Sequence, residues 1–279
     1  MPTVRTNDVD TYYERSGEGP PVVFVHGAIV DHGQWDPQVE RLAGEYTVVT
    51  YDLRGHGRTG PSDRSAYSIE LFAEDLAALV DALGLERPVV VGHSMGGCVA
   101  LAYAVAHPDG LSGLVLADSF GPRPLDWRER LQRSSLRATI PLVRLFGYER
   151  VERWQVWLQE RLQGEGVSGD YERVEALRAT GPLMTSEEFA KVIRALVAFA
   201  RSGLDPAAVA VPTLVLHGEN DAGFVRRQAA HLGATIPDAT VQSVPDAGHA
   251  ANLDNPDAFT TDLGAFLARV TPGEDDGAA

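Results

Sequence analysis

The sequence predicts an α/β protein with a doubly wound, mostly parallel sheet. Short β-branched runs alternate with amphipathic helical patterns along most of the chain, and a strand, a sharp turn and a helix follow one another over residues 89–106. Between residues 120 and 205 strand-like runs vanish and helical patterns take over. This alternation indicates binding sites above the carboxyl ends of the strands. We therefore expect a core of residues 1–119 and 206–279 and an inserted helical lid at 120–205.

The N-terminal part supplies the first strands. Residues 4–15 are expected to form a hairpin that turns at Asn7-Asp8. A helix over 68–83 is predicted because its apolar residues share one face and Gly84 follows it. The other elements expected before the lid are strands at 21–25, 46–51, 89–92 and 111–117, and helices near 35–43 and at 95–106.

Capping signals mark helices in the remaining chain. Thr185-Ser186-Glu187-Glu188 has the pattern of a capping box, and Asn255-Pro256 pairs a cap with proline at the first helical position. The other expected elements are helices at 149–163 and 225–232 and strands at 211–216 and 240–244.

Composition restricts the compartment and the partners. The chain has 279 residues, a formal net charge of −15 and one cysteine, Cys98, which excludes an internal disulfide. The acidic balance argues against nucleic acid and anionic membranes as partners. The N-terminus lacks the apolar region of a signal peptide, and no apolar run approaches the length of a membrane span. We expect a cytoplasmic protein, with Cys98 packed in the core.

The turn at 92–96 carries the strongest chemical signal. Gly92-His93-Ser94-Met95-Gly96 is a Gly-x-Ser-x-Gly pentapeptide between a buried strand and a helix. A turn this sharp strains its central residue and leaves room only for small flanking residues. It lifts the serine hydroxyl above the sheet at a helix N-terminus. Ser94 is therefore the predicted nucleophile.

A serine nucleophile needs a base and an orienting acid. His249 follows the last predicted strand on a glycine-preceded loop, so it is the predicted base. Two aspartates between Ser94 and His249 follow predicted strands. Asp221 is the favoured acid because its loop precedes the strand that delivers His249. Asp118 is the alternative, and otherwise a residue that caps the hinge into the lid.

Two backbone N–H groups and four side chains are candidates for the oxyanion hole and the substrate pocket. Backbone N–H groups of Ala28 and Met95 are the expected oxyanion donors. Tryptophans in the lid either pack its helices together or line an apolar substrate pocket. The candidate pocket residues are His32, Trp35, Trp154 and Trp157.

Motifs in this order and spacing resemble the α/β-hydrolase fold family. They are Phe24-Val25-His26-Gly27, Asp52-x-Arg54-Gly55-x-Gly57-x-Thr59, Gly92-x-Ser94-x-Gly96-Gly97, the loop to Asp221, and Gly248-His249. Within the family, the chain resembles the branch of lidded serine esterases, cofactor-free haloperoxidases and enol-lactonases. The resemblance implies a catalytic triad and an oxyanion hole, without a metal or organic cofactor.

The residues and the resemblance together predict a serine hydrolase. It would cleave a carboxylic ester of a small, largely apolar substrate through an acyl-enzyme on Ser94. Two alternatives stay open. One is hydrolysis of a lactone or a carbon–carbon bond by the same residues, and the other is a ligand receptor that keeps the fold and its pocket without turnover.

Overall fold

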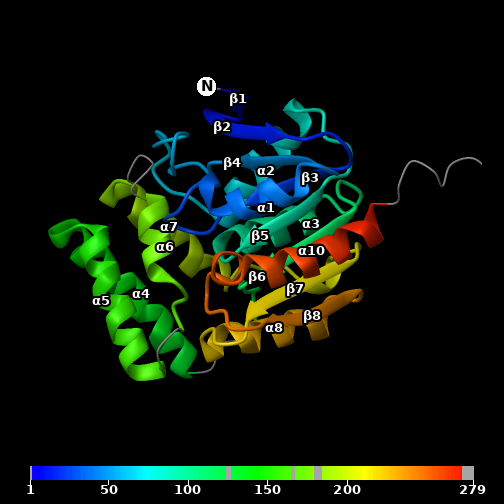
Figure 1. Ribbon diagram of the computed structural model, residues 1–279. Helices are drawn as coiled ribbons and strands as arrows, with labels where there is room; N and C mark the ends of the chain where they lie inside the picture. The colour runs from blue at the N-terminus through cyan, green and yellow to red at the C-terminus, as the bar shows by residue number, and fades with distance from the viewer. Residues whose placement is uncertain (1, 124–126, 165–166, 179–183, 272–279) are drawn as a thin grey trace, which may run out of the picture.

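The computed structural model describes residues 2–123, 127–164, 167–178 and 184–271. An eight-stranded sheet forms its centre, in the order β1-β2-β4-β3-β5-β6-β7-β8 (Figure 1). β1 and β2 pair antiparallel, β2 is antiparallel to β4, and all other pairs are parallel. The strands are β1 (Thr3–Thr6), β2 (Val9–Ser16), β3 (Pro21–Val25), β4 (Thr47–Tyr51), β5 (Val89–His93), β6 (Gly113–Ala117), β7 (Thr213–Gly218) and β8 (Ala239–Val244). This topology confirms the predicted fold class.

Helices cover both faces of the sheet, as the strand sequences require. β5 and β6 are buried along their whole length, which is typical of parallel strands that pack on two sides. α2 (Ile69–Ala82), α3 (Met95–Ala106) and α8 (Gly223–Thr235) contribute buried side chains to the core on one face. η1 (His32–Trp35), α1 (Asp36–Leu42), α9 (Ala251–Asp254) and α10 (Pro256–Val270) do so on the other.

Between β6 and β7 the described residues form helices and their connecting loops, without a strand. The helices are α4 (Trp127–Phe146), α5 (Tyr148–Gln163), α6 (Tyr171–Arg178) and α7 (Ser186–Phe199), followed by the short η2 (Pro206–Ala208). In Figure 1 α4 and α5 lie side by side at one end of the molecule, with α7 nearer the sheet. The division at residues 120 and 205 stays a prediction. None of the described helices is long and apolar enough to cross a bilayer.

One buried polar cluster fastens α7 to the core. Thr185 caps the helix, since its side chain accepts from the Glu188 N–H, as the capping pattern predicts. The Glu188 carboxylate, however, turns inward and accepts from the Tyr67 hydroxyl and from Lys191 Nζ, the latter at 2.7 Å. Lys191 also donates to the Ser62 carbonyl at 3.1 Å. The only lysine of the chain therefore joins α7 to the loop before α2.

Candidate active site

Ser94 occupies a strained turn between β5 and α3. Its backbone has φ 51° and ψ −112°, a conformation that costs an L-residue about 1 to 3 kcal/mol. The Ser94 N–H donates to the Ala117 carbonyl at 2.8 Å, which fixes the turn against β6. The hydroxyl of Ser94 is thereby presented at the carboxyl edge of the sheet, beside the first turn of α3.

The flanking glycines allow two segments to approach closely. A Cβ on Gly92 would lie 2.3 Å from the Gly96 carbonyl oxygen, and one on Gly96 would lie 2.2 Å from the Val25 carbonyl oxygen. Both contacts are with backbone atoms, which cannot turn aside. The predicted restriction to small residues at these two positions therefore has a physical cause in the structure.

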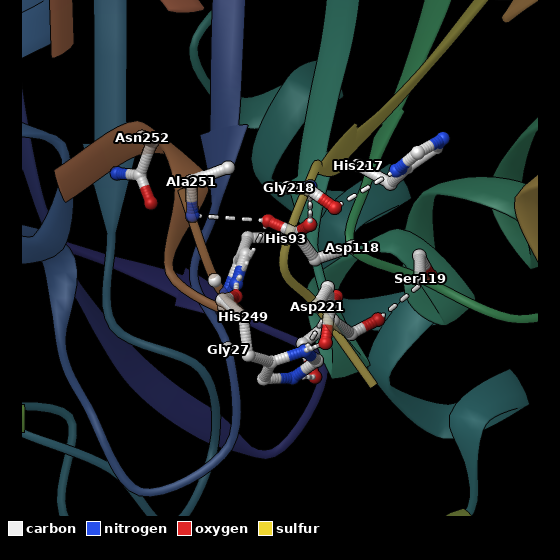
Figure 2. A network of polar contacts seen from close by, with 12 residues as sticks. Gly27, His93, Asp118, Ser119, His217, Gly218, Asp221, His249, Ala251 and Asn252 are labelled. Carbon is white, nitrogen blue, oxygen red and sulfur yellow. Dashed lines mark hydrogen bonds and ion pairs between the residues drawn. The ribbon is translucent and has the colours of Figure 1, made fainter. Parts of the chain in front are cut away.

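Three predicted side chains meet above this turn. The Ser94 hydroxyl lies within hydrogen-bond distance of His249 Nε2, at 3.1 Å. On the other side of the imidazole, His249 Nδ1 lies 3.1 and 3.2 Å from the two carboxylate oxygens of Asp221. Figure 2 shows His249 facing Asp221, each on a loop that follows a strand. The Asp221 side chain is fully buried, whereas that of His249 is 36% exposed.

The electrostatics of this arrangement favour the protonated imidazole. Burial opposes protonation of His249, but the Asp221 carboxylate, with Asp118 and Asp254 further away, raises the pKa of the imidazole to about 9. A histidine in this setting accepts a proton from a hydroxyl and holds it beside a carboxylate.

Asp118, the alternative acid, has other partners. Its carboxylate accepts from the Gly218 N–H at 2.8 Å and from the Ala251 N–H at 3.1 Å, as Figure 2 shows. Burial and the nearby Asp221 raise the pKa of Asp118 well above its ordinary value. The expectation that Asp118 caps the hinge into the lid does not fit these contacts. Asp118 instead ties the end of β7 to the chain just after His249.

His93 holds the same loop from the other side. The His93 Nε2–H donates to the His249 carbonyl at 2.7 Å. Burial first, and then the neighbouring His249, lower the pKa of His93 to about 3, so the ring stays neutral at ordinary pH. No spacing rule could have found this contact, since the two residues are 156 positions apart.

The expected oxyanion donors lie beside Ser94. Met95 is the first residue of α3, where N–H groups have no acceptor within the helix. Ala28 lines the same cavity as Ser94. Before it, the Gly27 N–H donates to the Gln34 side chain at 2.9 Å, which orients this loop.

A cavity of about 340 Å³ opens above Ser94 and His249. It is bounded by the chain after β3, by the segment after His249 and by helices α4, α5 and α6. Apolar side chains that line it are Ile29, Val30, Leu136, Val156, Val174 and Leu253. Its dimensions suit one small organic molecule.

None of the four candidate pocket residues is among the residues that line this cavity. Trp35 is fully buried in the core behind the sheet, where it packs on Phe24 and Phe259. Trp154 and Trp157 are 54% and 60% exposed. The structure therefore places Trp35 in the core and Trp154 and Trp157 on the outer side of α5, and the lining of this cavity is not aromatic at these three positions.

His32 belongs to a polar cluster next to the site. Its Nδ1 lies 2.7 Å from the Asp52 carboxylate, and its Nε2 lies 3.3 Å from Glu14. Asp31, His32 and Asp52 are also the one group of potential metal ligands found among the described residues. Since the His32 ring and the Asp52 carboxylate contact each other, and Asp52 also accepts from the N–H groups of His32 and Arg58, hydrogen bonding accounts for the cluster.

The sheet topology, the serine turn and the facing histidine and aspartate define a hydrolase of the α/β type. The family model of the alpha/beta hydrolase fold matches residues 20–256, and the chain belongs to this family.

Relatives with named activities match nearly the whole chain. A protein of Azorhizobium caulinodans, named as a RutD carbamate hydrolase, is 31% identical over 97% of this chain and 99% of its own length. A thermophilic esterase of Thermogutta terrifontis has a TM-score of 0.82, with 28% identity over 97% of this chain and 100% of its own. The enol-lactonase of Burkholderia xenovorans LB400 has a TM-score of 0.79, with 25% identity over 96% and 100%.

Proposed function

We propose that this hydrolase cleaves carboxylic esters through an acyl-enzyme on Ser94. The observation that carries the proposal is the continuous set of contacts from Ser94 through His249 to Asp221, beside a cavity of about 340 Å³. The three relatives are named for a carbamate, an ester and an enol-lactone, and each name implies attack at a carbonyl carbon.

In the proposed reaction, the Ser94 oxygen attacks the ester carbonyl while His249 Nε2 takes the hydroxyl proton. Asp221 stabilises the imidazolium and fixes the ring tautomer. The N–H groups of Ala28 and Met95 stabilise the negative charge on the carbonyl oxygen. The C–O bond then breaks, the alcohol leaves with the proton from His249, and a water molecule activated by His249 releases the acid.

A 4-nitrophenyl ester of a short acid tests this proposal. The wild-type protein should release 4-nitrophenolate, and Ser94→Ala should lose a factor of about 10⁴ or more in kcat with an unchanged circular dichroism spectrum. Ser119→Ala is the matched control, because its hydroxyl donates to the Ser94 carbonyl from outside the set of reacting groups. Binding of esters without turnover would instead support a receptor.

Lactone opening is a second candidate because the enol-lactonase has the same fold over 96% of this chain. It needs no further residue, since a lactone is a cyclic ester whose alcohol stays attached to the acyl group. A comparison of kcat/KM for a five-membered lactone and for the open ester of the same acid distinguishes the two activities.

A further inference from the structure

Helix α5 has its polar and apolar sides reversed relative to the cavity that it covers. Glu152, Gln155, Val156 and Gln159 line the cavity, and their spacing places them on one side of the helix. The large apolar side chains of α5 face solvent instead: Trp154, Trp157, Leu158 and Leu162 are between 48% and 73% exposed. A helix that only closed an apolar pocket would present the opposite pattern.

The inward side chains offer hydrogen bonds that the described residues do not use. No hydrogen bond to the Gln155 or Gln159 carboxamide is found among the residues that the structure describes. Ser168, on the chain between α5 and α6, also lines the cavity. Its Oγ is buried and has no hydrogen-bond partner within the described parts of the chain. A buried hydroxyl of this kind is costly unless a partner reaches it, whereas the two glutamines are half-buried and their carboxamides stay available to a ligand.

The charge of the cavity wall restricts which chemical groups of a ligand can bind to these side chains. Glu152 contributes a carboxylate, and the described residues that line the cavity include neither lysine nor arginine. An anionic group on a substrate placed at this wall would therefore meet a carboxylate, without a lysine or arginine among the described lining residues to pair with. A glutamine side chain carries both an N–H₂ donor and a carbonyl acceptor, so two of them match a group with the same pair of functions.

We propose that Gln155, Gln159 and Ser168 form a subsite for a neutral amide-type group on the substrate. Carboxamides and ureas are groups of this class, with N–H donors and a carbonyl acceptor on one planar unit. The subsite lies in the same cavity as Ser94, so it selects among the esters that the proposed function assigns to this protein and rests on that function. The substrate is then polar at one end, in contrast to the largely apolar substrate that the sequence suggested.

Four 4-nitrophenyl esters test the subsite. They share one six-carbon acyl chain, which ends in a carboxamide, in its isosteric isopropyl group, in an ammonium or in a carboxylate. The wild-type kcat/KM should be at least about tenfold higher for the carboxamide ester than for the other three. A wild-type preference for the isopropyl, ammonium or carboxylate ester would overturn the proposal, and this comparison needs no variant.

The double variant Gln155→Leu/Gln159→Leu should lower the ratio of carboxamide to isopropyl kcat/KM at least about tenfold, mainly through KM, and should keep turnover of the isopropyl ester. Leu162→Gln makes the reverse exchange on the outer side of the same helix, where Leu162 is 73% exposed, and should leave the ratio unchanged. An unchanged ratio in the double variant would overturn the subsite. Equal hydrolysis of all four esters would remove only the subsite, whereas hydrolysis of none would remove the proposed function as well.

Discussion

The carboxyl edge of the sheet and the helical segment between β6 and β7 differ in how far the local sequence pattern determines where a side chain lies. At the sheet edge, each candidate catalytic residue lies on the turn or loop that follows a strand: Ser94 after β5, Asp221 after β7 and His249 after β8. In the helical segment, the pattern predicted α5 and the cap of α7, but not which side of α5 turns inward. A sequence motif at the end of a strand therefore predicts where its side chain lies, because the sheet topology fixes that end. The amphipathic pattern of a helix does not show by itself whether a given side faces a cavity or solvent.

Strand order explains why the edge was predictable. β6 separates β5 from β7, so the Ser94 turn and the Asp221 loop lie two strands apart and the loop after β8 must return across the edge to deliver His249. Asp118 at the end of β6 supports this return through the N–H groups of Gly218 and Ala251. Asp118 thus holds the backbone of the returning loop, whereas Asp221 faces the His249 ring. The sequence left both aspartates open as the partner of His249.

The largest expected effect on activity distinguishes these two aspartates at the sheet edge. Asp221→Asn should lower kcat by about 10³ to 10⁴, because it removes the carboxylate that fixes the His249 tautomer and stabilises the imidazolium. The melting temperature should change little, because asparagine has the same shape as aspartate. Asp118→Asn should keep at least about a tenth of the activity and lower the stability by about 1 to 3 kcal/mol, since it weakens a buried acceptor of two N–H groups. Ester kinetics and thermal unfolding of both variants give the answer, and the reverse pattern would make Asp118 the acid.

A smaller effect concerns pH. The base must be neutral, so kcat/KM should fall about tenfold per pH unit below the pKa of His249. Asp221 raises that pKa to about 9, and partial exposure of the ring moderates the rise through solvent screening. The acidic limb should therefore have its midpoint above about 6.5, the usual imidazole value. In Asp221→Asn the residual activity should titrate at lower pH. A midpoint below about 6.5 in the wild-type protein would contradict the claim that Asp221 raises the pKa of His249.

The smallest expected effect on activity is at the junction of α7 with the core. Lys191→Met leaves the buried Glu188 carboxylate without its cation and should cost about 3 kcal/mol of unfolding free energy, while ester turnover stays within about tenfold. Arg194→Met on the exposed side of α7 is the control and should change the stability by less than about 0.5 kcal/mol. Equal melting temperatures for the two variants would show that the pair does not fasten α7.

These residues also show where prediction from sequence ends. The strands, most helices, the Ser94 turn and the approach of His249 to Asp221 could be predicted because each depends on local pattern and strand order. The inward turn of Glu188 toward Lys191, and the contact of His93 with the His249 carbonyl, depend on packing between distant segments. The four-residue α9 was not predicted, since a helix this short has no amphipathic period. The outward aromatic side of α5 had no signal in the sequence at all.

Covalent trapping of the nucleophile tests the central claim most directly. Diethyl 4-nitrophenyl phosphate should release one equivalent of 4-nitrophenolate per protein chain and abolish ester hydrolysis in proportion. Peptide mass spectrometry should then place the diethyl phosphoryl group on Ser94, and His249→Ala should react far more slowly because no base activates the hydroxyl. A label on Ser119, 25 positions away and hydrogen-bonded to the Ser94 carbonyl, or full activity after stoichiometric labelling would contradict the assignment of Ser94.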